Sequence, residues 1–193
     1  MDETQKDWVK FLKDGNEKSF FNIYESSVHS LYSYGIAQGF SHDQCLDAIQ
    51  DIFLKLYINK SKLHHINNLR FYLLRSFKNR LFDIIRKNRK SEPLTDKNLP
   101  FAVEVSVSEL LEHKEEQSFL KRKVEKILSL LTDRQREAVY LRYMQDLDYE
   151  EIATMMDMQS ESVRKLVFRA LESVRKETRD NFLKFFILIL HLF

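Results

Sequence analysis

Cysteine, proline and glycine are scarce in this 193-residue sequence, which contains one, two and three of them respectively. The single cysteine, Cys45, excludes an internal disulfide and a cluster of thiolate metal ligands. Its place among apolar helix positions predicts a small buried side chain. Because glycine and proline interrupt regular structure, their scarcity beside abundant Leu, Lys, Glu, Phe and Ile predicts an all-α chain.

Sequence patterns for catalysis are also missing. The chain has no Gly-rich phosphate loop, no nucleophile elbow and no metal-binding helix with paired His and Glu. The pair His64 and His65 has no further ligands at metal spacing. We therefore expect no enzymatic activity, no metal and no cofactor.

No apolar run reaches the ~20 residues that a membrane-spanning helix needs. The longest, residues 182–193, is interrupted by Lys184 and His191. We expect it to pack on the C-terminal domain or on a protein partner, and membrane association is the alternative. Acidic residues ahead of Trp8 are unlike a signal peptide, so the expected compartment is the cytoplasm.

Charge is unevenly distributed although the net formal charge is only +2. Residues 70–90 hold eight basic residues and one acidic residue, whereas residues 91–115 hold two basic and six acidic residues. A basic block followed by an acidic spacer fits a local contact with a polyanion. The spacer also contains Pro93 and Pro100 and loses helical periodicity. We therefore predict two small helical domains, residues 1–90 and 118–180, joined by a flexible linker (91–117) and followed by an apolar tail (181–193).

Residues 1–40 carry aromatic and aliphatic side chains at helical spacing. Trp8 and Phe11 predict a short helix that stops near Gly15, and Phe21, Tyr24 and Leu31 predict a longer one. We expect these side chains to form core.

Residues 132–176 contain the pattern of a helix-turn-helix. Capping-box patterns occur at Thr132 with Gln135 and at Asp148 with Glu151. Residues 156–159 break the helix that Asp148 begins, and Ser160 opens the next one. One face of that second helix is apolar: Val163, Leu166, Val167, Ala170, Leu171 and Val174. The opposite face carries Arg164, Lys165, Phe168, Arg169, Arg175 and Lys176. A basic second helix suits the DNA major groove, although two bundle helices with a solvated charged face fit the same pattern.

A third capping box, Ser41 with Gln44, opens a helix that runs to about Tyr57. The side chains expected to be buried there are Leu46, Ile49, Phe53 and Leu56. Gln50 and Asp51 lie off that stripe beside Leu54, as an exposed polar pair bordered by apolar residues. This is an ordinary helix surface or a contact for a partner helix.

Residues 71–89 alternate cations with aromatic rings along one helix face. The residues in this stripe are Phe71, Arg75, Lys78, Phe82, Arg86 and Arg89. Cations that follow phosphates and rings that stack on bases are what single-stranded nucleic acid needs, and Asn79 beside the stripe is suited to bond a base edge. The alternative is that Phe71 and Phe82 pack on a neighbouring helix.

Two stretches together carry a recognisable order of motifs. Residues 49–57 (IQDIFLKLY) precede residues 71–86 (FYLLRSFKNRLFDIIR), and residues 131–175 contain L-T-x-x-x-R-E, L-R-Y, D-Y-x-E-I-A, S-V-R and R-A-L in that order. They resemble regions 2 and 4 of bacterial RNA polymerase sigma factors of the extracytoplasmic-function (ECF) type. Tyr72 replaces the usual Trp of region 2. Asp146 replaces the Gly usual before the helix-turn-helix, and Asp tolerates left-handed backbone geometry.

The resemblance implies roles for matching residues. Core RNA polymerase would bind Gln50, Asp51, Phe53 and Leu54. The melted −10 strand would contact Tyr72, Arg75, Lys78, Asn79, Arg80 and Arg86. The −35 duplex would contact Ser162, Arg164, Lys165, Phe168 and Arg169.

The hypothesis is an ECF-type sigma factor with core polymerase, promoter DNA and an anti-sigma protein as partners. An independent helix-turn-helix regulator and an adaptor anchored at a membrane by the apolar tail are the rival hypotheses.

Overall fold

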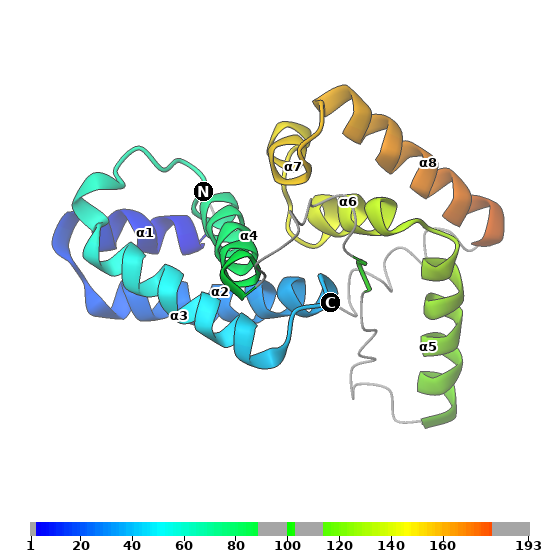
Figure 1. The fold of residues 1–193 in the computed structure, drawn as a ribbon, viewed down its shortest axis with the longest axis horizontal. Coiled ribbons are helices and arrows are strands. Elements are labelled where there is room, and N and C mark those ends of the chain that lie inside the picture. The colour runs from blue at the N-terminus through cyan, green and yellow to red at the C-terminus, as the bar shows by residue number, and fades with distance from the viewer. Residues whose placement is uncertain (1–2, 89–99, 103–113, 179–193) are drawn as a thin grey trace. The chain divides into compact units, whose positions relative to one another are not determined.

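A computed structural model of the chain describes residues 3–88, 100–102 and 114–178. Every regular element within these ranges is a helix, and none of the described residues forms a strand. The chain divides into two compact units, Met1–Asn98 and Leu99–Phe193 (Figure 1). The predicted class, two helical units in an all-α chain, is confirmed.

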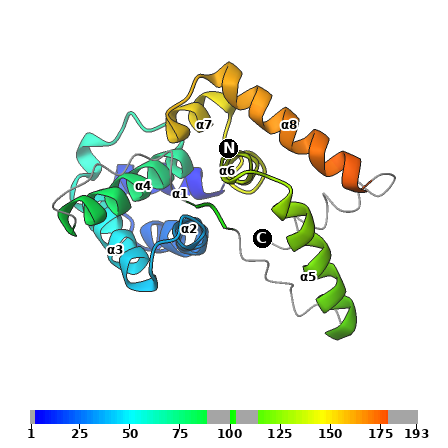
Figure 2. The ribbon, with the colours of Figure 1, turned by 45° about the vertical axis from the view of Figure 1, so that its right-hand side comes forward.

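Four α-helices and a short 3₁₀ helix build the N-terminal unit. They are α1 (Glu3–Asp14), α2 (Glu17–Ala37), α3 (His42–Ile58), η1 (Lys60–Lys62) and α4 (Leu69–Asn88). Helix α2 packs against α1, α3 and α4, and α3 packs against α4 (Figures 1 and 2). The capping box predicted at Ser41 and Gln44 is present, and so is the helix end at Gly15, which has a φ of 64°.

The core of this unit is aromatic. Trp8 and Phe11 are fully buried, and the Phe11 ring lies 4.9 Å from that of Phe20 and 5.7 Å from that of Tyr57, centroid to centroid. Phe20 also meets the edge of Phe53 at 6.0 Å. These rings join α1, α2 and α3, because offset and edge-on aromatic pairs are the favourable arrangements.

Small residues occupy the tightest helix contacts. A Cβ atom on Gly35 of α2 would lie 2.6 Å from Cys45 Sγ of α3 and 3.0 Å from the Phe77 ring of α4. Cys45 is fully buried, as predicted, and burial raises the pKa of its thiol to about 11. The three helices therefore approach one another at a point where only a hydrogen atom fits.

Two large side chains that the periodicity places in the core are on the surface. Phe21 is 59% exposed and Leu46 is 44% exposed. The core-facing sides of α2 and α3 hold Ser19, Gly35, Cys45 and Ala48 among their buried residues. The prediction was wrong because it followed the largest apolar side chains, whereas closely packed helices bury small ones.

The C-terminal unit contains α5 (Lys114–Ser129), α6 (Asp133–Tyr143), α7 (Tyr149–Met156) and α8 (Ser160–Thr178). Helix α8 packs against α6 and α7. Its core cluster joins α5 to α8 and consists of Val124, Ile127, Leu131, Ala170 and Val174. An ion pair of 2.7 Å between Lys126 and Glu177 links the same two helices at the surface. The capping boxes predicted at Thr132 and Asp148 are both present.

Phe101, which the sequence assigns to the linker, is a core residue of this unit. Its ring is 1% exposed and meets that of Tyr140 edge-on at 5.5 Å. Its carbonyl accepts a hydrogen bond of 2.7 Å from Arg136 Nε. The same guanidinium donates to the carbonyls of Leu128 and Leu131. Arg136 thus satisfies carbonyl groups at the end of α5 and fixes Phe101 against α6.

Two expectations concern residues beyond the described ranges. The apolar run 182–193 lies outside them, and so does most of the acidic linker. Within the described part of the chain, no helix is long and apolar enough to span a membrane. No group of three or more His, Cys, Asp or Glu side chains in that part is arranged to hold a metal ion.

Candidate nucleic-acid and protein interfaces

Helices α7 and α8 form the helix-turn-helix. The Asp148 side chain accepts a hydrogen bond from the backbone N–H of Glu151, and the Glu151 carboxylate accepts one from the N–H of Asp148. Asp157 ends α7 in the left-handed conformation, with a φ of 50°, and the N–H of Met158 donates to the Ala153 carbonyl. A short helix, a left-handed turn and a longer helix thus follow one another without a further connecting segment.

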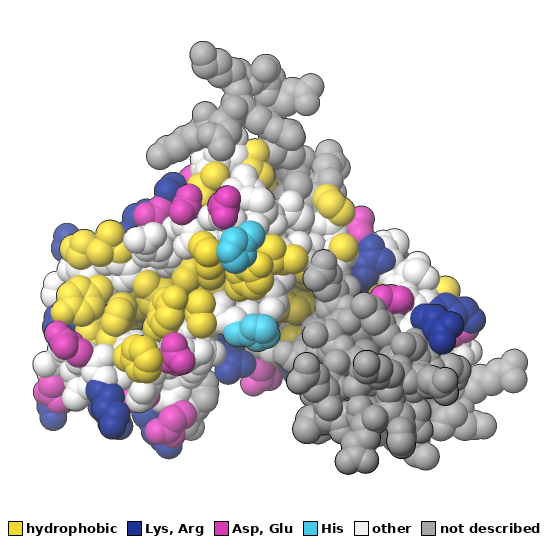
Figure 3. Space-filling view, turned by 90° about the horizontal axis from the view of Figure 1, so that it is seen from below, with side chains coloured by type: hydrophobic (Ala, Val, Ile, Leu, Met, Phe, Trp, Pro, Cys, Tyr) yellow, Lys and Arg dark blue, Asp and Glu magenta, His cyan; other side chains and the backbone are white. Residues whose placement is uncertain are grey.

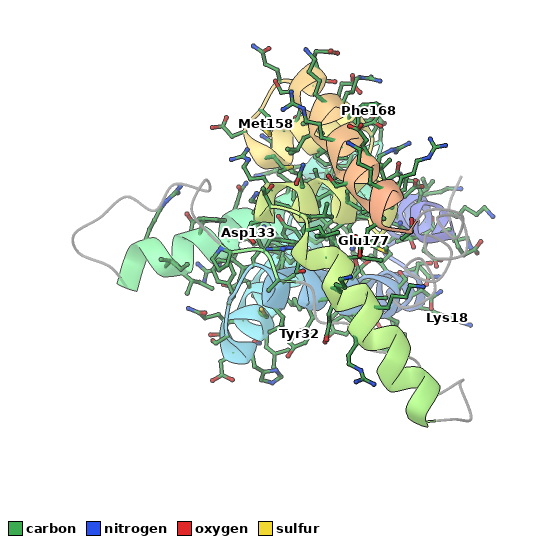
Figure 4. The ribbon with its side chains drawn as sticks, turned by 90° about the vertical axis from the view of Figure 1, so that its right-hand side faces the viewer. Lys18, Tyr32, Asp133, Met158, Phe168 and Glu177 are labelled. Carbon is green, nitrogen blue, oxygen red and sulfur yellow. The ribbon has the colours of Figure 1, made fainter. Side chains whose placement is uncertain are left out.

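One face of helix α8 is buried and the opposite face is exposed. Val163, Val167, Ala170 and Val174 are buried, as the sequence predicts, and Leu166 and Leu171 are half-buried. The five predicted DNA-contacting residues are all exposed: Ser162, Arg164, Lys165, Phe168 and Arg169. Phe168 is 68% exposed and lies on the outer side of the helix (Figure 4). An exposed aromatic ring between cations is unusual for a face that only meets solvent.

The cations of α8 differ in their partners. Arg164 lies 3.6 Å from a Glu150 carboxylate oxygen, and Lys165 lies 3.4 Å from one of Glu161. No acidic side chain in the described residues pairs with Arg169. Among the cations predicted to contact DNA on α8, Arg169 is therefore the one whose charge is least compensated by the described residues.

The connection before α7 uses a second left-handed aspartate. Asp146 has a φ of 51°. The neighbouring Leu147 is fully buried, and its N–H donates to the Leu141 carbonyl. The expectation that Asp takes over from Gly at this position is confirmed.

On α4 the predicted stripe of cations and rings is only partly at the surface. Arg75, Asn79 and Arg86 are exposed, while Tyr72 and Arg80 are half-buried. Lys78 is 5% exposed and Phe82 is 7% exposed, the latter against the Phe40 ring at 5.9 Å.

Phe82 therefore packs against a neighbouring side chain, as the alternative interpretation expected. The exposed positions predicted for Phe82 and Lys78 are wrong. The stripe follows the border of the buried face of α4, so Lys78 and Phe82 in its middle turn toward the core while Arg75 and Arg86 stay exposed. Arg89 lies outside the described residues.

On α3 the four residues predicted to bind polymerase do not share one surface. Gln50 is exposed and Leu54 is 56% exposed. Phe53 is 4% exposed because it packs against Phe20 and Tyr24, so its ring supports α3 from inside. Asp51 is half-buried and forms an ion pair with Arg80 of α4. The exposed polar pair predicted at Gln50 and Asp51 is corrected to Gln50 alone.

The full apolar surface around Gln50 was not predicted from the sequence. Leu46, Leu54 and Ile58 are exposed and lie at steps of four and eight residues along α3. Apolar side chains gather in a band on the face of the N-terminal unit seen in Figure 3, with charged side chains at its margins. Counting from Gln50 in steps of four would have found these residues.

The sequence of the C-terminal unit matches a known family model. Residues 121–174 match the model described as "Sigma-70, region 4", which covers the second half of α5, all of α6 and α7, and most of α8. Two curated relatives come from Bacillus subtilis (strain 168). ECF RNA polymerase sigma factor SigM is 22% identical over 153 residues, which is 79% of this chain and 91% of the relative. ECF RNA polymerase sigma factor SigW is 23% identical over 189 residues, or 89% and 95% of the two chains. The C-terminal unit thus matches sigma-70 region 4, and the chain as a whole is similar to ECF RNA polymerase sigma factors.

A solved structure shares the fold. A chain in the structure of CnrH in complex with the cytosolic domain of CnrY aligns with a TM-score of 0.55 at 16% identity, covering 91% of this chain and 97% of the matched one. These similarities support a function in transcription initiation. Sigma factors are not a class of enzymes.

Proposed function

We propose that this chain acts as a sigma factor, a dissociable initiation subunit that binds promoter DNA at two places. The N-terminal unit, sigma region 2, binds core polymerase and captures the melted −10 strand. The C-terminal unit, sigma region 4, holds the −35 duplex. The observation that carries the proposal is the exposed face of α8, where Arg164, Phe168 and Arg169 project from the second helix of a helix-turn-helix.

Arg169 is the strongest candidate for reading the −35 element. Its guanidinium is exposed and lacks an acidic partner among the described residues, so binding DNA does not first require breaking an ion pair. An arginine that is bidentate to guanine gives about 1–3 kcal/mol of discrimination, whereas a phosphate contact gives affinity without sequence choice. Ser162 and Lys165 on the same face supply further polar contacts.

For the −10 strand, the exposed side chains of α4 carry the proposal. Arg75 and Arg86 are placed to follow phosphates, and Asn79 is placed to bond a base edge. Tyr72 and Arg80 are half-buried and reach the strand only at the margin of this face. Lys78 contributes no surface contact in the structure described, since it is 5% exposed.

The polymerase contact is proposed for the outer face of α3. Gln50 supplies a polar group that is flanked along the helix by Leu46, Leu54 and Ile58, all exposed. An apolar stripe with one central polar group suits the groove or face of a partner helix. This surface suits the contact with core RNA polymerase that the family resemblance implies.

A protein that binds this sigma factor and blocks polymerase is a further expected partner. CnrH, which shares the fold, was solved in complex with the cytosolic domain of CnrY. We propose that an anti-sigma protein binds this chain as well, and that the complex forms in the cytoplasm where polymerase acts.

Run-off transcription with core polymerase tests the proposal. Arg169→Ala should lower initiation from a −35-dependent promoter by roughly ten-fold while leaving core binding intact, as expected for one lost base contact. Leu54→Asp should do the reverse and reduce core binding itself, because it places a charge at an apolar contact.

Lys123→Ala, at an exposed position on α5, is the matched control and should change neither quantity. A wild-type chain that neither binds core polymerase nor directs initiation from any promoter would refute the proposal. DNA binding without core binding would favour an independent helix-turn-helix regulator.

A further inference from the structure

Two arginines from different helices lie over one tyrosine ring in the helix-turn-helix. The Arg164 guanidinium carbon, on α8, lies 4.4 Å from the centroid of the Tyr149 ring. The Arg142 guanidinium carbon, on α6, lies 5.3 Å from the same centroid. Tyr149 is the first residue of α7, so this ring connects all three helices at the cationic surface.

The ring is held in place by its surroundings. The capping box of Asp148 and Glu151 fixes the first turn of α7, where Tyr149 begins the helix. Arg142 donates a hydrogen bond of 2.8 Å from Nη1 to the Leu147 carbonyl, two residues before Tyr149. Tyr149 is half-buried, whereas half of the Arg164 side chain is exposed. The ring is therefore the fixed partner, and Arg164 is the group that it orients.

The Glu150 carboxylate adds a second restraint on Arg164. One of its oxygens lies 3.6 Å from Arg164 Nη2 and accepts a hydrogen bond of 3.0 Å from the Ser160 hydroxyl. An exposed ion pair at this distance contributes little by itself. Together with the ring, however, it restricts a side chain that otherwise samples many rotamers.

Orientation matters for a guanidinium that reads DNA. A planar guanidinium over an aromatic face is attracted to the ring, and the N–H groups at its edge stay available for bidentate bonds. A side chain that is already ordered loses less conformational entropy on binding than a free one. A free arginine on the same helix face has to be ordered by the DNA itself.

We propose that Tyr149 is a positioning residue for promoter recognition. Its ring holds Arg164 in the orientation that contacts the −35 duplex, and Arg142 steadies the ring from α6. The inference rests on the proposed −35 role of α8, and it assigns a function to a residue of α7 that does not itself lie on the recognition helix.

Replacing the ring provides the first test. The probe is a promoter-length duplex that full-length wild-type chain with core polymerase recovers from a random-sequence pool. Because the DNA would then have to order the Arg164 side chain, Tyr149→Ala should bind this duplex roughly three- to ten-fold more weakly. Tyr149→Phe keeps the ring and should stay within about two-fold of wild type. Equal binding by Tyr149→Ala and wild type, or equal weakening by Tyr149→Ala and Tyr149→Phe, would overturn the proposal.

A double-mutant cycle separates positioning from a general loss of structure. If the ring acts through Arg164, Tyr149→Ala should weaken binding much less when Arg164→Ala is already present. Lys165 is the matched control, because it pairs with Glu161 and lies on the same face. The effects of Tyr149→Ala and Lys165→Ala should simply multiply. A structural defect would instead give the same loss in both backgrounds, and that result would contradict the proposal.

Sequence selection by the wild-type chain separates failure of the proposed function from failure of the positioning role. If wild-type chain with core polymerase recovers no preferred −35 sequence, the proposed function fails. If it recovers one and Tyr149 shows no coupling to Arg164, only the positioning role fails.

Discussion

At the scale of single residues, stability depends on a few close contacts between helices. Gly35 is the clearest example, because helices α3 and α4 both approach its Cα. Trp8 is the one tryptophan in the chain and is fully buried in the same unit. Its fluorescence therefore reports unfolding of the N-terminal unit alone.

Gly35→Ala should destabilise the N-terminal unit. Alanine favours the helix by about 1 kcal/mol, but overpacking costs about 1–3 kcal/mol. The new Cβ would lie 2.6 Å from Cys45 Sγ and 3.0 Å from the Phe77 ring, and both neighbours are fully buried, so neither moves easily. We expect a net loss of about 1 kcal/mol in urea unfolding followed by Trp8 fluorescence.

The Gly35→Ala/Cys45→Ala double variant tests the cause of that loss. Removing Sγ should make the double variant less destabilised than the sum of the two single changes. Ser33→Ala, on the same helix, is the control and should change little. Additive effects would show that the Cys45 contact is not the origin of the loss.

Cys45 should resist alkylation in the native protein. Its side chain is fully buried, and burial raises the pKa of the thiol from 9.0 to about 11. Between pH 8 and 9 the native chain should react with iodoacetamide far more slowly than the chain in urea, as measured by mass spectrometry.

The same pKa shift makes a prediction about stability. The thiol loses its proton near pH 9 in the unfolded chain and near pH 11 in the folded one. The contribution of Cys45 to the free energy of unfolding is therefore complete below pH 9 and is lost as the pH rises to 11. Comparable alkylation rates in native and unfolded protein would contradict the buried, protonated thiol.

At the scale of elements, three of the helices begin with capping boxes and two of the connections contain left-handed aspartates. The three boxes, at Ser41, Thr132 and Asp148, are visible in the sequence because the hydrogen bonds join residues only three positions apart. Asp146 and Asp157 have φ values of 51° and 50°. Left-handed geometry costs a residue with a Cβ roughly 1–2 kcal/mol, so these turns retain strain.

Asp146→Gly should relieve part of this strain, whereas Asp146→Val should increase it. The glycine variant is expected to stabilise the C-terminal unit by up to about 1 kcal/mol, because the backbone entropy that glycine loses offsets some of the gain. The valine variant should destabilise it by about 1–3 kcal/mol. Native-state hydrogen exchange of α7 and α8 measures both changes, and the same sign for both variants would refute the role of the backbone angle.

At the scale of the whole molecule, the segment between α4 and α5 packs onto the C-terminal unit at its own midpoint, Phe101. Phe101 is buried against Tyr140, and burial raises the pKa of the Tyr140 hydroxyl to about 12. This attachment point lies midway along the chain between Asn88, which ends α4, and Lys114, which begins α5. The connection from the end of α4 to the C-terminal unit therefore ends at Phe101. It contains about half of the residues between α4 and α5.

Phe101→Ala should weaken the C-terminal unit without affecting the N-terminal one. Removing a buried phenylalanine ring costs about 3–5 kcal/mol in a well-packed core, and Arg136 would keep its bonds to Leu128 and Leu131. We expect faster hydrogen exchange in α6, with an unchanged urea transition for Trp8. Unaltered exchange in α6 would show that the Phe101 ring contributes little to the unit.

By itself, the sequence determined the all-α class, the helix ends and the helix-turn-helix. Each of these depends on interactions between residues that are near one another along the chain. Ser41, Thr132 and Asp148 cap their helices by bonds over three residues, and the face of α8 that carries Arg169 follows from its apolar periodicity.

Tertiary structure decided which large side chains are buried, because that depends on how closely neighbouring helices approach. Gly35 and Cys45 bring α2 and α3 together, and helix packing leaves Phe21 and Leu46 outside. The burial of Lys78 and Phe101, and the contact of Tyr149 with two arginines from other helices, likewise join residues that no local pattern relates.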